Sequence, residues 1–179
     1  MSRTIAFLRA INVGGHNVKM DQLRALFEEM GFANVETYIA SGNVIFDTPS
    51  KPNDKLEQKI EAALEKALGY EVATFCRTDS ELAAVATYAP FSEKELAEAK
   101  ALNVAFLKAP LNEEQLAGLK QFHTDIDDFH TQGCELYWKC RLKQSDSTFN
   151  NARMERALKL KATFRGINTV RKMAANYAS

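Results

Sequence analysis

An arginine, two glycines and a lysine follow a short apolar run near the start of the chain. Arg9 ends that run, Gly14 and Gly15 come next, and Lys19 precedes an amphipathic segment. Paired glycines let backbone N–H groups turn toward an anion, and the N-terminus of a following helix adds partial positive charge. Arginine and lysine donate charge-assisted hydrogen bonds to phosphate or carboxylate oxygens. The segment therefore predicts an anion-binding loop.

Two side chains in the same region would suit an enzyme instead. His16 is a candidate general base near neutral pH, and Ser41 is a candidate nucleophile. The loop lacks the Gly-Lys-Ser/Thr ending of a P-loop, and Ser41 lacks a GxSxG elbow. An enzyme acting on a small phosphorylated substrate is therefore an alternative, and so is a turn in which the glycines only reverse the chain.

A second set of candidate ligand-binding residues lies near the C-terminus. Asn168 is expected to cap the last helix, with Arg171 and Lys172 in its first turn, where the helix dipole disfavours cations. A phosphate bound close to Arg165 would compensate for this repulsion, and an acidic neighbour would do the same.

Basic residues gather in the last third of the chain. Residues 139–172 hold ten Lys or Arg against two acidic residues, whereas residues 1–90 hold nine against twelve. Such a segment can bind nucleic acid, another anion, or the acidic part of the same molecule. Nucleic-acid binding through this segment is thus an alternative to the anion-binding loop.

Composition favours a soluble globular protein without a metal. The 179 residues are 46% hydrophobic and 26% charged, with a formal net charge of +0. Cys76, Cys134 and Cys140 lack CxxC spacing, so we expect free thiols in a reducing compartment. His123 and His130 flank several aspartates but do not converge as metal ligands. The first apolar run is too short for a signal or a membrane span, so the cytoplasm is expected, and no cofactor can be assigned.

Periodicity in the first half predicts a βαββαβ unit. The expected strands and helices occupy residues 4–10, 20–30, 35–40, 44–47, 54–68 and 71–77, with a hairpin turn at Ser41, Gly42 and Asn43. This is the pattern of a ferredoxin-like unit. In that topology the end of the first strand, the start of the first helix and the hairpin turn meet at one end. The ligand-binding residues expected there are Arg9, Asn12, Gly14, Gly15, Lys19, Ser41 and Asn43.

The second half repeats the same pattern. Phe7-Leu8-Arg9-Ala10 matches Phe106-Leu107-Lys108-Ala109, and Ala73-Thr74-Phe75 matches Ala162-Thr163-Phe164. We therefore expect an α+β fold of duplicated ferredoxin-like units packed as one pseudo-symmetric body, with residues 1–90 and 91–179 each ending in a helix. The first copy has about six extra residues after its first strand, so the shared topology does not require the glycine loop.

Three blocks of sequence resemble the signatures of a known family. They are Leu8-Arg9-Ala10-Ile11-Asn12-Val13-Gly14-Gly15, then Ser41-Gly42-Asn43-Val44-Ile45-Phe46, then Thr163-Phe164-Arg165 with Asn168-Thr169-Val170. The chain is similar in these blocks to the bacterial family catalogued as domain of unknown function 1697. The resemblance implies a bacterial protein, and it carries no established activity.

Overall fold

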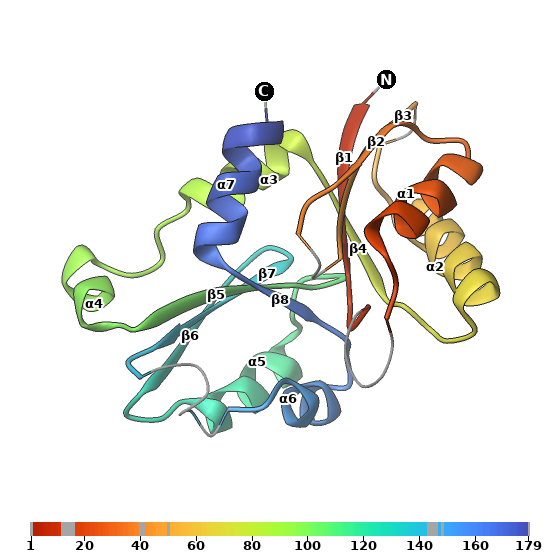
Figure 1. The fold of residues 1–179 in the computed structure, drawn as a ribbon. Helices are drawn as coiled ribbons and strands as arrows, with labels where there is room; N and C mark the ends of the chain where they lie inside the picture. Colours follow the sequence, from red (N-terminus) through yellow and green to blue (C-terminus); the bar gives the residue numbers. More distant parts are fainter. Residues whose placement is uncertain are drawn as a thin grey trace. The chain divides into compact units, whose positions relative to one another are not determined.

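The fold is α+β, with two antiparallel sheets and helices around them (Figure 1). The computed structural model describes residues 2–11, 17–39, 42–49, 51–142, 147 and 149–178. The chain divides into two compact units, one formed by Met1–Ala84 with Lys172–Ser179 and the other by Val85–Arg171. Each unit contains one four-stranded sheet.

The first unit has its strands in the order β2-β3-β1-β4. Its elements are β1 (Ser2–Leu8), α1 (Met20–Glu29), β2 (Ala33–Thr37), β3 (Asn43–Thr48), α2 (Asp54–Leu68) and β4 (Thr74–Thr78). Local signals set the ends of α2, because the Asn53 side chain accepts a hydrogen bond from the Leu56 N–H and Gly69 adopts a left-handed φ of 84°. The expected helix at residues 54–68 is confirmed.

One face of this sheet packs against α1 and α2. Ala6 and Leu8 of β1 belong to the same core cluster as Phe46 of β3, Leu23 of α1 and Ile60 of α2, all fully buried. Both faces of β1 are buried, since Ile5 and Phe7 are also 0% exposed. This explains why β1 is a continuous apolar run rather than an alternating one.

The second unit has its strands in the order β6-β7-β5-β8. Its elements are α4 (Glu93–Glu98), β5 (Ala101–Phe106), α5 (Glu113–Leu119), η1 (Lys120–Phe122), β6 (Asp127–Gln132), β7 (Glu135–Cys140), α6 (Asn151–Leu158) and β8 (Thr163–Gly166). Asn112 and Gln115 form a capping box at the start of α5, with reciprocal side-chain bonds of 2.7 and 3.0 Å.

Two helices have residues in both units. They are α3 (Asp79–Thr87) and α7 (Ile167–Tyr177). The sequence assigned the whole C-terminal helix to the second unit, but residues 172–179 belong to the first. The reason is local contact: Arg3 Nη1 donates to the Tyr177 carbonyl at 3.3 Å, and the rings of Tyr38 and Tyr177 meet edge to face.

The two sheets share a hydrogen-bond register. Ile5 of β1 pairs with Ile45 and Arg77, and Val104 of β5 pairs with Tyr137 and Arg165. Beyond the ends of these strands, the Leu8 N–H donates to the Gly42 carbonyl at 2.8 Å and the Leu107 N–H donates to the Cys134 carbonyl at 2.9 Å. Positions in one sheet can therefore be compared directly with positions in the other.

Candidate functional site

Three connections of the first unit meet where β1 ends. The Leu8 N–H donates to the Gly42 carbonyl in the turn between β2 and β3, and the Arg9 N–H donates to the Ala73 carbonyl before β4 at 2.9 Å. The Tyr70 hydroxyl donates to the Ile11 carbonyl at 3.3 Å. The sequence placed the end of the first strand and the hairpin turn at one end of the sheet, and these bonds join them.

Arg9 and Lys19 flank the glycine loop in different surroundings. Arg9 is half-buried and its backbone is held by the bond to Ala73, whereas Lys19 is exposed. Ala10 has a φ of 55°, a left-handed conformation that ends β1 at Leu8. Lys19 is the N-cap residue of α1 and forms no side-chain cap, so the side-chain acceptors that cap α2, α4, α5 and α6 have no counterpart there.

Asn43 takes part in the structure of the turn. The residue is 0% exposed, and its Nδ2 donates to the Tyr38 carbonyl at 2.8 Å while the Tyr38 N–H donates to the Asn43 carbonyl at 3.0 Å. Its amide nitrogen thus closes the β2–β3 turn. The expected role of Asn43 as a ligand-orienting residue stays a prediction, and it would have to use the amide oxygen.

Five of the candidate functional residues lie outside the described residues. They are Asn12, Gly14, Gly15, His16 and Ser41. The two residues that bracket the loop are described: Ile11 and Val18 are 1% and 4% exposed and belong to the core cluster of the first unit. Both ends of the loop are therefore anchored in the core of the first unit.

The C-terminal candidates do not form the arrangement that the sequence suggested. Because α7 begins at Ile167, Asn168 is its second residue rather than its cap, and Arg171 falls in the second turn. The repulsion expected from the helix dipole fades beyond the first turn, so no bound phosphate is needed to offset it. Asn168 and Arg171 are exposed.

Arg165 is a buried residue with local partners. It is 7% exposed, and its Nη1 donates to Thr163 Oγ1 at 2.8 Å and to the Phe164 carbonyl at 2.9 Å. Burial disfavours the charged form and lowers the pKa of Arg165 to about 10. At β4 the corresponding Arg77 is also buried, and it donates to the Cys76 carbonyl at 2.9 Å.

The basic segment at residues 139–172 loses two cations to the interior. Lys139 is buried, with its Nζ 3.0 Å from Asp128 Oδ2 and 4.9 Å from the centre of the Phe91 ring. Arg165 is buried as well. Tyr137 and Trp138, which a single-strand binder would use for base stacking, are 1% and 2% exposed. The exposed basic residues that remain among those described are Arg141, Arg153, Arg156, Lys159, Lys161, Arg171 and Lys172.

The described residues contain no group of three metal-ligating side chains. The two histidines of the second unit have other partners, since His123 Nδ1 lies 3.9 Å from Asp128 Oδ1 and His130 Nε2 lies 2.7 Å from the Tyr88 hydroxyl. In the same described part of the chain, no helix has the length and apolar character needed to cross a membrane.

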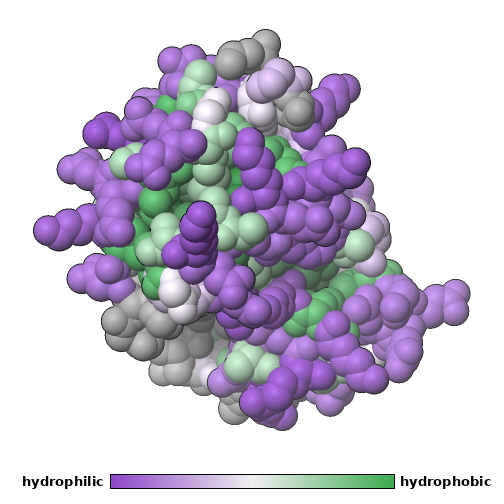
Figure 2. All heavy atoms as spheres, turned by 90° about the vertical axis from the view of Figure 1, so that its right-hand side faces the viewer, coloured by the Kyte–Doolittle hydropathy of each residue, from purple (hydrophilic) through white to green (hydrophobic). Residues whose placement is uncertain are grey.

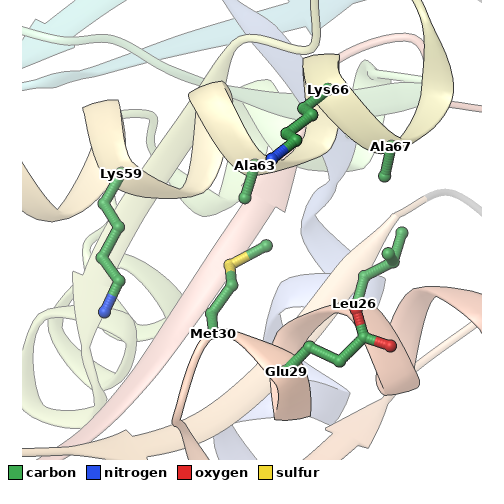
Figure 3. Close-up of a pocket in the computed structure, with 7 residues that line it drawn as sticks. All are labelled: Leu26, Glu29, Met30, Lys59, Ala63, Lys66 and Ala67. Atoms are coloured by element: carbon green, nitrogen blue, oxygen red, sulfur yellow. The ribbon is translucent and has the colours of Figure 1, made fainter.

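Sequence reasoning missed a hollow between α1 and α2, with a volume of about 560 Å³ (Figure 3). Its lining residues are Leu26, Glu29, Met30, Lys59, Ala63, Lys66 and Ala67. The available signal was the pair of alanines four residues apart on α2, because small residues there leave space beside α1.

Comparison with known proteins places the chain by family and fold. A sequence model of the family described as "Protein of unknown function (DUF1697)" matches residues 1–137, a range that contains the first two signature blocks, and the predicted family is confirmed. Among solved structures, the chain is similar to the conserved bacterial protein SP0830 from Streptococcus pneumoniae, with a TM-score of 0.79 over 100% of this chain and 99% of that one, at 21% sequence identity. A search of curated proteins finds no match.

Proposed function

We propose, on the premise that this chain belongs to the DUF1697 family of proteins of unknown function, that it binds a phosphate-bearing or other anionic small molecule where β1 ends. In this proposal Arg9 supplies the main charge, Lys19 closes over the ligand from the start of α1, and the loop between them supplies backbone donors.

The observation that carries the proposal is the placement of Arg9. Its backbone N–H donates to the Ala73 carbonyl and its side chain is half-buried, so the backbone that carries the guanidinium is held in place. An arginine whose backbone is held in place loses less conformational entropy when it binds an anion. The residues on either side of the loop, Ile11 and Val18, are both buried in the core of the first unit.

The two units also support the proposal if they are copies of one ferredoxin-like unit, as we propose. Their strand orders and registers correspond. Eleven residues separate Leu8 from the start of α1, whereas five separate Leu107 from the start of α5. A connection that the scaffold can make with five residues does not need a glycine loop, so the longer loop is free to serve a ligand.

A thermal-shift screen tests this proposal. The panel contains inorganic phosphate, nucleotides, sugar phosphates, polyphosphate, coenzyme A, and short RNA and DNA at low and moderate salt. A ligand present at 100 times its dissociation constant stabilises the folded protein by about 2.7 kcal/mol, which raises the melting temperature by several degrees.

The matched pair of variants is Arg9→Gln and Lys108→Gln. Lys108 follows β5 as Arg9 follows β1, so both variants remove one cation at the corresponding position. We expect the small-anion shift to disappear in Arg9→Gln and to persist in Lys108→Gln. Equal shifts in both variants would refute the site. Stabilisation by oligonucleotides alone, lost at moderate salt, would favour nucleic-acid binding by the exposed basic residues.

A further inference from the structure

The helix layer of the first unit is open on its solvent side. The hollow between α1 and α2 has Leu26 and Met30 on one wall and Ala63 and Ala67 on the other (Figure 3). A second hollow of about 360 Å³ lies next to it, and the two share Lys59. Figure 2 views the side on which Figure 1 draws these helices, and it shows hydrophobic surface among hydrophilic side chains.

The rim of this groove is mainly basic. Lys59 and Lys66 lie on α2 and Glu29 lies on α1, and the second hollow adds Lys55. Among the described residues neither Lys59 nor Lys66 forms an ion pair, and Lys59 Nζ sits 5.1 Å from the centre of the Phe32 ring. The groove therefore combines an apolar floor with ammonium groups that lack an acidic partner in this part of the chain.

The scaffold does not require this opening. In the second unit the corresponding helices α5 and α6 are in close contact, because Gln115 Nε2 donates to the Leu158 carbonyl at 3.0 Å. A Cβ on Gly118 would lie only 2.9 Å from Leu158 Cδ2, so the absence of a side chain there lets the two helices approach. One helix pair is thus closed by its own side chains, while the other leaves a hollow of about 560 Å³.

We propose that the groove between α1 and α2 binds an amphipathic helix of a partner protein, with apolar side chains on the floor and carboxylates against the lysines. Helix-in-groove recognition uses apolar anchors spaced three and four residues apart, and the lining positions on α1 and α2 repeat with the same spacing. Met30 adapts its shape to different apolar partners.

Charge and length select this occupant over a small acid. Lys55 and Lys66 are eleven positions apart on α2, with Lys59 between them, which corresponds to about 16 Å along the helix axis. A single carboxylate reaches one of these ammonium groups. A helix of three to four turns with glutamates along one flank reaches all three, and Glu29 on the opposite wall repels a misplaced acidic flank.

Binding of model peptides tests the proposal. The probe is a fluorescein-labelled 18-residue amphipathic helix with a leucine face flanked by glutamates, and its control has lysines in place of the glutamates. Fluorescence anisotropy should show saturable binding of the acidic peptide and at least tenfold weaker binding of the basic one. Amide shifts in NMR spectra of the complex should be confined to α1, α2 and the segment around Phe32.

Two independent variants separate charge from shape. Lys59→Glu with Lys66→Glu should weaken binding of the acidic peptide at least tenfold, and Ala67→Leu should weaken it similarly by filling the floor without a change in charge. The matched control is Lys94→Glu with Arg153→Glu, two exposed cations of the second unit, and it should bind like the unmodified protein. Circular dichroism checks that each variant is folded.

Several results would overturn the proposal. They are equal binding of acidic and basic peptides, NMR shifts outside α1, α2 and the segment around Phe32, and no saturable binding below 1 mM peptide. Binding of laurate in the groove without binding of peptide would assign it to a small acid. A dimer in sedimentation velocity that Ala67→Leu dissociates would assign it to a second copy of the chain. None of these results bears on Arg9, so the anion site stands or falls separately.

Discussion

The two units solve the same packing problem with different helix layers. In both sheets the first and third strands of the unit are central and the second and fourth are at the edges, and both sheets have two helices against one face. In the second unit, Gly118 and Gln115 bring α5 onto α6, whereas in the first unit Ala63 and Ala67 line a hollow between α2 and α1. The strand order therefore does not decide whether the helix layer is closed, and a few side chains in that layer do.

In both units a glutamate from a helix accepts a backbone hydrogen bond at the outer edge of the sheet. Backbone N–H groups in β4 and just before β8 donate to carboxylates from a helix: Glu57 and Glu61 accept hydrogen bonds from the Cys76 and Thr74 N–H groups, and Glu155 accepts one from the Ala162 N–H at 2.8 Å. An edge strand with unpaired N–H groups invites pairing with another chain. These carboxylates cover the edge in both units.

The largest effects should come from the aromatic residue at the centre of each core. Phe46 stacks on Phe32 with ring centres 4.3 Å apart, and Trp138, at the corresponding position, lies 4.6 Å from Phe149. Because each ring is almost fully buried, Phe46→Ala and Trp138→Ala should each lower the free energy of unfolding by about 3–5 kcal/mol. Urea denaturation followed by circular dichroism measures the loss. A loss below 1 kcal/mol for either variant would break the correspondence of the two cores.

A smaller pair of effects should distinguish the two hairpin turns. Gly42 has a φ of 87°, and a Cβ there would lie 2.6 Å from Ile11 Cγ2, whereas Gly133 has a φ of 57° with nothing within 4 Å of its Cβ position. Gly42→Ala combines a left-handed alanine with overpacking and should destabilise by about 2–4 kcal/mol. Gly133→Ala places an alanine in the left-handed region without overpacking, and it should lower the free energy of unfolding by about 1 kcal/mol. Thermal denaturation of both variants under one buffer condition compares them.

The elements that were predictable from the sequence are those with local signals. Asn53 and Gly69 fix the ends of α2, Asn112 and Gln115 begin α5, and an apolar run marks β1. Each of these depends on residues only a few positions apart, so composition and spacing were sufficient.

Features that depend on register were not predictable. The sequence match aligned Phe75 with Phe164, but Phe75 pairs with Phe7 and Thr163 pairs with Phe106, one position away. Asp128 faces Lys139 only because β6 and β7 pair in one register. For this reason Lys139, one of the ten cations of residues 139–172, is buried rather than exposed. The groove beside α2 depends on side-chain volumes on two helices, and apolar periodicity does not report volume.

The edge carboxylates give a third comparison, with an intermediate effect. Glu57→Ala and Glu155→Ala each leave a buried N–H without its charged acceptor, so each should destabilise by about 1.5–3 kcal/mol. Glu65→Ala on the exposed side of α2 is the control and should change the free energy of unfolding by less than 0.5 kcal/mol. Urea denaturation at neutral pH measures all three. Similar stabilities for Glu57→Ala and Glu65→Ala would show that the edge does not need its carboxylate.

The smallest expected effect is a difference between the two sheets in how the free energy of unfolding depends on pH. Tyr137 takes the position that Ile45 holds in the first sheet, and its hydroxyl donates to the Val85 carbonyl at 3.3 Å. Burial, with Glu135 and Tyr88 nearby, raises the pKa of Tyr137 well above its ordinary value. A raised folded-state pKa contributes stability that is complete below pH 10 and is lost as the pH rises further, because the unfolded phenol ionises first.

Tyr137→Phe should therefore lower the free energy of unfolding by about 1 kcal/mol at pH 7 through the lost hydrogen bond, and flatten its decline above pH 10. Tyr70→Phe is the control, since the pKa of Tyr70 is also raised by burial but the residue is only half-buried, and it should keep most of the alkaline decline. Urea denaturation from pH 7 to pH 11.5 measures both variants. An unchanged alkaline slope in Tyr137→Phe would mean that the second sheet opens before Tyr137 ionises, and the buried phenol would then have no part in the difference between the two units.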